Sequence, residues 1–125
     1  MVSHLVRASV LAFVCAACAA TTVTTATART PYDGAWSVLI VTERGSCDRA
    51  YRYGVQIVNG IVTYDGGAAN LSGQVASNGS VRVTVSSSNG YANGSGRLSR
   101  NSGSGSWSGR STSDACSGYW TAERR

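Results

Sequence analysis

From Tyr32 onward, apolar and polar residues alternate along this chain with a period of two. Trp36, Val38 and Ile40 fall on one side of the segment 35–43, and similar alternation continues almost to the C-terminus. This period is typical of half-buried antiparallel strands, and no apolar stripe with the 3.6-residue period of a helix interrupts it. We therefore expect an all-β protein. Its eight short strands are predicted at 35–43, 51–58, 61–65, 71–76, 81–87, 91–99, 105–110 and 116–123.

Glycine-containing turns separate the expected strands. Asn59-Gly60, Asn78-Gly79 and Asn89-Gly90 each lie between alternating runs, and Asn-Gly favours the type I′ turn of a β-hairpin. The segments 65–67 and 101–105 predict two further turns. Consecutive hairpins give an antiparallel meander, and closing the meander removes its exposed edges. We predict a small closed barrel or a barrel-like sandwich.

The second half of the chain combines large rings and glycines on the face expected to point inward. Trp107 and Trp120 share this face with small residues: Ala92, Gly94, Gly96, Gly103, Gly105, Gly109, Gly118 and Ala122. Glycine is tolerated in a strand that curves or that lies beneath a large ring. Because an eight-stranded barrel is just wide enough for side chains to fill, we expect a filled interior. The alternative is a narrow cavity lined by Trp36, Tyr53, Trp107 and Trp120.

The first 28 residues have the features of a secretory signal peptide. A weakly basic start precedes the apolar run ASVLAFVCAACAA, and the A-x-A motif that ends at Ala28 predicts cleavage after that residue. The apolar run is too short for a permanent membrane-spanning helix. Lipidation of Cys18 is the alternative processing. We expect residues 29–125 to form one secreted or periplasmic domain without a transmembrane segment.

Two cysteines, Cys47 and Cys116, remain after the expected cleavage. Because an exported chain meets an oxidising compartment, the pair predicts a disulfide. The first and last strands of a closed barrel are neighbours, so this bridge would fasten the closure. The chain's one histidine, His4, lies in the leader. We therefore predict no metal site in the exported domain, and no motif predicts a cofactor.

Arginine supplies all the basic side chains of residues 29–125, which contain ten arginines, no lysine and six acidic residues. Arginine suits contact with carboxylates and phosphates, although a solvated basic surface is the simpler interpretation. The candidate surface-binding residues are Arg49, Arg52, Arg82, Arg97 and Arg110. The tyrosines are too scattered to interleave with arginine, which argues against nucleic acid. The expected partner is an anionic envelope component or another exported protein.

No recognisable catalytic constellation occurs in residues 29–125. The absence of histidine there excludes histidine-based acid–base and triad chemistry, and bridged cysteines leave no thiol nucleophile. Asp48 and Asp114 are the candidates for a glycosidase carboxylate pair, but acidic residues beside Gly, Ser or Cys usually serve turns. We expect a non-enzymatic binding or envelope-associated module that uses its arginine-rich polar surface. The alternative is a carrier of a small hydrophobic ligand.

The order of several motifs resembles that of a family of small exported bacterial proteins. The motifs are GAWSV, GSCDRAYRYGVQIVNG, GSGRL, GSGSWSG and CSGYWTAERR, which start at residues 34, 45, 94, 103 and 116. The resemblance implies export and this fold class but no particular activity. The start Gly34-Ala35-Trp36 is also similar to that of calycin barrels, the lipocalin and avidin group. Many lipocalins set a basic residue of the last strand against this tryptophan, which implies that place for Arg124.

Overall fold

The structure, a computed structural model, describes residues 29–67 and 69–125. The expected leader, its cleavage after Ala28 and the alternative lipidation of Cys18 lie outside the described residues. Eight strands follow one another along the chain: β1 (Gly34–Arg44), β2 (Ala50–Val58), β3 (Ile61–Thr63), β4 (Asn70–Val75), β5 (Ser80–Ser87), β6 (Gly90–Leu98), β7 (Ser102–Ser111) and β8 (Ala115–Arg124).

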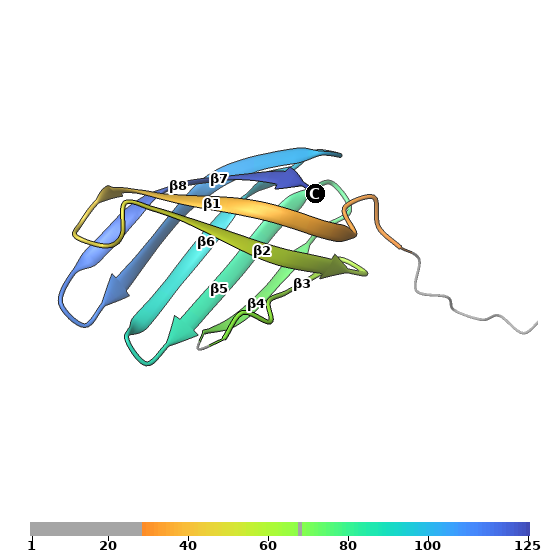
Figure 1. The fold of residues 1–125 in the computed structure, drawn as a ribbon. Helices are drawn as coiled ribbons and strands as arrows, with labels where there is room; N and C mark the ends of the chain where they lie inside the picture. Colours follow the sequence, from red (N-terminus) through yellow and green to blue (C-terminus); the bar gives the residue numbers. More distant parts are fainter. Residues whose placement is uncertain (1–28, 68) are drawn as a thin grey trace, which may run out of the picture.

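The strands form a closed antiparallel barrel in which each pairs with its neighbours in sequence, and β1 pairs with β8 (Figure 1). This arrangement confirms the predicted all-β meander and its closure. Trp36 lies opposite Val55 on β2 and opposite Arg124 on β8. The register between β1 and β8 shifts between Thr42 and Arg44. A shift of this kind bends a strand and increases its twist, here at the end of β1 that leads into the loop carrying Cys47.

The barrel wall is weakest between β2 and β4, because β3 is only three residues long. β2 pairs with β3 over Gln56–Val58 alone, and β3 pairs with β4 at two positions, Ile61 and Val62. The first six residues of β2 therefore have no strand partner on this side. Tyr64, the residue after β3, packs edge-on against Tyr53 in this part of β2.

The Asn-Gly turns lie where the sequence predicts them, but only one of the three has the predicted type I′ conformation. Asn59 and Gly60 have φ values of 53° and 80°, as a type I′ turn requires. At the other two Asn-Gly pairs only the glycine has a positive φ. The loop between β5 and β6 has two residues, but they are Ser88 and Asn89, because Gly90 already belongs to β6 and pairs with Ser87. Four residues, 76–79, connect β4 to β5, and Asn78 Oδ1 accepts a hydrogen bond from the Ser80 amide. The expected turn at 101–105 is displaced toward Ser99, since β7 already begins at Ser102.

Glycines in β6 and β7 allow the large ring of Trp120 to lie against the wall. A Cβ atom at Gly96 or Gly105 would lie 2.6 or 2.7 Å from atoms of this indole. It would also collide with the backbone of the paired strand. The predicted combination of ring and bare backbone is therefore confirmed at Trp120. Gly94 differs, because a Cβ there would meet its nearest neighbour at 3.7 Å.

Candidate functional site

The barrel is hollow rather than filled. A cavity of about 470 Å³ occupies its interior and is lined by residues from β1 to β8. The expectation of a filled interior is therefore wrong, and the alternative of a lined cavity describes the structure. All four candidate lining residues, Trp36, Tyr53, Trp107 and Trp120, face this cavity. Its volume falls within the range of about 300–1,000 Å³ that is typical of small-molecule sites.

Two of the tryptophans that line the cavity are held by the backbone of the wall. Trp107 Nε1 donates to the Val41 carbonyl at 3.0 Å, and Trp120 Nε1 donates to the Ser95 carbonyl at 3.2 Å. A buried indole usually needs a partner for its N–H, and here the nearest acceptors belong to the backbone. Each ring is therefore anchored to the sheet. The cavity lies between the anchored rings and the other lining residues.

One end of the barrel is closed by the segment that precedes β1. Trp36 is 1% exposed, and its Nε1 donates to the Tyr32 carbonyl at 2.8 Å. The Arg124 guanidinium lies over the Trp36 ring, with Cζ 4.8 Å from the ring centroid. It also donates to the carbonyls of Pro31 and Asp33 at 2.6 Å each. The contact implied by the calycin resemblance is therefore present in this chain.

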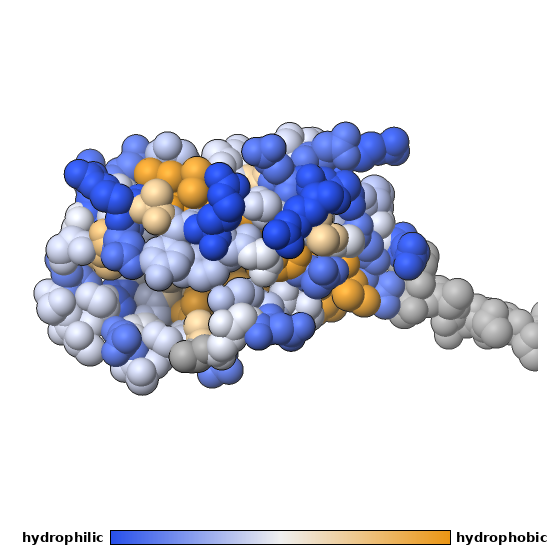
Figure 2. All heavy atoms as spheres, viewed as in Figure 1, coloured by the Kyte–Doolittle hydropathy of each residue, from blue (hydrophilic) through white to orange (hydrophobic). Residues whose placement is uncertain are grey.

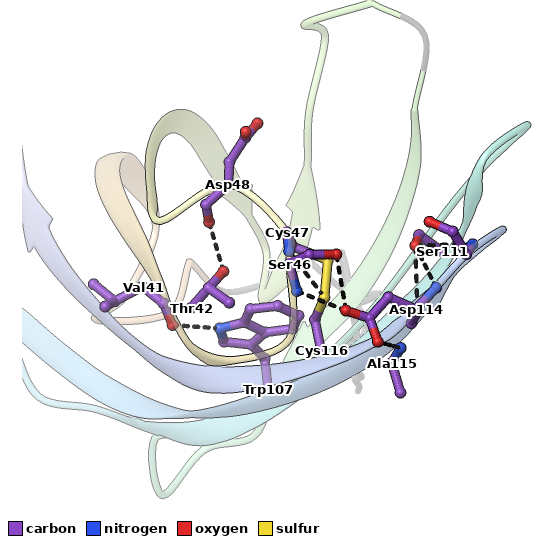
Figure 3. The surroundings of a disulfide bond; sticks show 11 residues. Val41, Thr42, Ser46, Cys47, Asp48, Trp107, Ser111, Asp114, Ala115 and Cys116 are labelled. Atoms are coloured by element: carbon purple, nitrogen blue, oxygen red, sulfur yellow. Dashed lines mark hydrogen bonds between the residues drawn. A yellow bond between two sulfur atoms is a disulfide. The ribbon is translucent and has the colours of Figure 1, made fainter.

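The other end carries the disulfide and remains open over much of its width. The bond between Cys47 and Cys116 ties the loop after β1 to β8 (Figure 3). Ser46 donates to the Asp114 carboxylate through its amide at 2.7 Å and through its hydroxyl at 2.8 Å. The predicted bridge and its place at the barrel closure are thus confirmed. The loop also covers Thr42, whose hydroxyl donates to the Asp48 carbonyl.

Three tyrosines gather where the cavity reaches the surface. Tyr51 and Tyr53 stack with ring centroids 5.3 Å apart, and Tyr64 meets Tyr53 edge-on at 5.7 Å. All three line the cavity, yet Tyr51 is 48% exposed. They stand beside the weak part of the wall between β2 and β4. On the side that shows β1 and β2, apolar atoms are visible between polar residues of the surface (Figure 2).

The electrostatics of the mouth are set by Asp48 and the tyrosines. Asp48 lines the cavity, and Figure 3 shows its carboxylate pointing away from the disulfide. Burial raises the pKa of Tyr53, with smaller contributions from Tyr51, Tyr64 and Asp48. The Tyr53 phenol therefore stays neutral at physiological pH. The alternation of β2 indicated Tyr51 and Tyr53, but the prediction did not include Tyr64 or Asp48 in the cavity lining. Asp48 lies in a loop, and Tyr64, expected within a strand at 61–65, follows the end of β3 at Thr63.

Asp114 does not have the environment of a catalytic acid. The hydrogen bond from the Ser46 hydroxyl, with those from the Ser46 and Ala115 amides, lowers its pKa. A general acid for glycoside cleavage needs a raised pKa, so the shift has the wrong direction. The Asp48 and Asp114 side chains point in different directions in Figure 3. These contacts assign Asp114 to holding the disulfide loop.

The five candidate arginines do not converge on one site. Arg52 lies on the outer face of β2 and donates to the Ser37 hydroxyl at 3.1 Å. Arg82 and Arg97 are diagonal neighbours on β5 and β6, because Arg82 pairs with Ser95. Arg110 lies near the opposite end of β7, and Arg49 belongs to the loop before β2. None of the five lines the cavity.

A shallow polar hollow on the outer side of β5–β7 contains Arg82 together with Thr84, Asn93, Ser95, Ser106 and Ser108. Among the residues that the structure describes, there is no group of three or more side chains suited to hold a metal ion. The same residues contain no helix long and apolar enough to cross a membrane. Comparisons with protein-family models, with curated proteins and with solved structures give no significant match for this chain.

Proposed function

We propose that this protein binds a small apolar or amphiphilic molecule inside the barrel. The observation that carries the proposal is the cavity of about 470 Å³ and its lining. Apolar walls with few polar groups are the usual features of a small-molecule site, and an eight-stranded barrel has room for one small ligand. Carriage of a small ligand, the alternative drawn from the sequence, is therefore better supported than surface binding through arginines.

The position of the lining residues also supports ligand binding. Trp36 and Ile57 are buried at the closed end, whereas Val85, Ala92 and Trp107 are only half-buried nearer the open end. Apolar side chains that stay partly accessible inside a barrel gain little from folding alone. A ligand that covers them would recover that burial. We infer that the accessible half of the interior is the binding surface.

A neutral hydrophobic dye, N-phenyl-1-naphthylamine, provides a direct test. We expect its fluorescence to rise on binding and the tryptophan emission to change at the same time. Gly94→Leu should weaken dye binding by roughly tenfold or more, because the new side chain occupies the cavity and its Cβ meets no atom closer than 3.7 Å.

Gly54→Leu is the matched control. Gly54 lies on the outer face of β2, and a Cβ there would contact only the side chain of Arg125, at 3.3 Å. This variant should bind the dye as the parent does. Absence of dye binding by the parent protein, or equal binding by the Gly94→Leu variant, would overturn the proposal.

A further inference from the structure

Few of the side chains that face the cavity are charged. Of the 24 lining residues, none is an arginine, although the chain has a formal net charge of +5. Asp48 is the one acidic side chain among them. The one acidic side chain of the lining therefore lies at the mouth, whereas all the arginines of the described residues lie outside the cavity.

The tryptophans that line the cavity provide no free hydrogen-bond donor. The indole N–H groups of Trp36, Trp107 and Trp120 each donate to a backbone carbonyl. The remaining lining toward the closed end is aliphatic, and includes Ile57, Val62 and Leu98. A polar group of a ligand would lose its hydration here without gaining a partner. The deep part is thus suited to the apolar body of a ligand.

The mouth offers the opposite environment. The stacked rings of Tyr51 and Tyr53, with Tyr64 edge-on to Tyr53, line the cavity where Asp48 also lies. Aromatic faces attract a cation through the ring quadrupole, and clustered aromatic rings are a known means of holding ammonium groups. Asp48 accepts the Thr42 hydroxyl through its backbone carbonyl, and no side chain of the described residues donates to its carboxylate. The carboxylate oxygens are therefore available to a ligand.

We propose that the cavity selects an amphiphile with an apolar body and a cationic ammonium head, which lies at the mouth beside Asp48 and the tyrosine rings. This assignment rests on the proposed function and specifies its ligand class. An anionic head at the same place would meet the Asp48 carboxylate with no lining arginine to compensate. A neutral head would gain neither the ion pair nor the cation–π contact.

Three ten-carbon probes with different head groups test this assignment: decylamine, decanol and decanoate. Each is titrated into the protein at pH 7, below the concentration at which it forms micelles, and its affinity is measured by displacement of the dye. We expect decylamine to bind roughly tenfold more tightly than decanol, with decanoate weakest, because an ion pair and a cation–π contact each contribute modestly at an exposed site.

Substitution of Asp48 identifies the group responsible. Asp48→Asn should remove most of the preference for decylamine over decanoate and leave the affinity for decanol unchanged. Asp65→Asn is the matched control, since it removes the same charge from an exposed residue that does not line the cavity. This control variant should keep the preference of the parent protein.

The possible outcomes separate the two proposals. If decanol and the dye bind but decylamine binds no more tightly than decanoate, the ligand class is wrong and the binding function stands. An unchanged preference in the Asp48→Asn variant would also overturn the assignment. If neither the dye nor any of the three probes binds, the proposed function fails and the ligand class fails with it.

Discussion

The two ends of the barrel are built from the same strands but are completed differently. At the closed end, inward-facing apolar residues are buried, as Trp36 at 1%, Ile57 at 3% and Ala122 at 3% exposure show. Toward the open end, inward-pointing side chains such as Val85 and Trp107 are half-buried, and Tyr51 is 48% exposed. Thr42 and Cys116, beside the disulfide loop, stay buried. Alternation along a strand sets which side chains point inward, but the segments at each end decide how deeply they are buried.

At the closed end, hydrogen bonds hold the segment before β1 across the barrel opening. Arg124 donates to the carbonyls of Pro31, Asp33 and Arg100, and so joins the segment before β1 to the turn between β6 and β7. The Asp33 carboxylate accepts hydrogen bonds from the amides of Asn59 and Gly60, which join the same segment to the turn between β2 and β3. These contacts hold the N-terminal segment across the end of the barrel.

The open end has comparable restraints, but they follow the rim. The disulfide and the Asp114 carboxylate both connect the loop after β1 to the beginning of β8, its neighbour in the barrel. Nothing in the described residues ties that loop to the chain between β3 and β4 on the far side. The rim is therefore fixed in place while the mouth stays uncovered. A binding cavity needs this combination of a stable wall and an accessible opening.

Truncation of one tryptophan at each end should give the largest contrast. Trp36→Ala is expected to lower the free energy of unfolding by about 5 kcal/mol, near the upper limit for such changes, because it empties a fully buried site. Trp107→Ala should cost only about 2 kcal/mol, since this ring is half-buried and borders a cavity. Urea unfolding of both variants measures the difference. Equal losses would show that the two ends contribute alike.

Removal of the disulfide addresses the open end directly. The bridge joins residues 69 apart in the sequence, and closing such a loop in the unfolded chain is worth about 4 kcal/mol in the chain-entropy account. The double variant Cys47→Ser, Cys116→Ser should therefore unfold at a much lower urea concentration than the parent. Reduction of the parent protein provides the control and should give a similar midpoint. An unchanged midpoint in both experiments would mean that Asp114 alone holds the rim.

The strands could be predicted from the sequence because each has one face inside and one outside. Alternation gave eight strands whose bounds differ from those of the structure by at most three residues. The cysteine pair indicated where the barrel closes. The same patterns identified Trp36, Tyr53, Trp107 and Trp120 as inward-facing residues. These features follow from the alternation of residues along each strand, and from the fact that the first and last strands of a closed barrel are neighbours.

The cavity could not be predicted in the same way. Its volume depends on how the aromatic rings are oriented. That orientation involves hydrogen bonds between residues far apart in sequence, such as the one from Trp107 to the Val41 carbonyl. The position of Tyr64 depends likewise on the short β3 and on the chain that follows it. Two of the three Asn-Gly pairs did not form a type I′ turn. One lies in a longer loop, and the other is shifted by one residue relative to its two-residue loop, because Gly90 pairs with Ser87.

The smallest effect, and the one that compares both ends within a single experiment, is the response to acid. The pKa of Asp33 is lowered from its ordinary value of 3.8, mainly by the hydrogen bond from the Thr30 hydroxyl, and amides of Asn59 and Gly60 add to this. The pKa of Asp114 is lowered at the open end, mainly by the Ser46 hydroxyl. A carboxylate whose pKa is lower in the folded state contributes stability above its unfolded-state pKa. That contribution is lost as the pH falls through the folded-state value.

We therefore expect thermal stability to decline below about pH 4, where both carboxylates become protonated. Asp33→Asn and Asp114→Asn should each lower the melting temperature at pH 7 and make it less dependent on pH below 4, with Asp65→Asn as the control of equal charge. The Asp33 variant should also weaken the closed end, so that Trp36 becomes accessible to a quencher, whereas the Asp114 variant should leave Trp36 protected. If both variants expose Trp36 equally, the two ends are not independent, and the closed end cannot serve as a fixed base for the cavity.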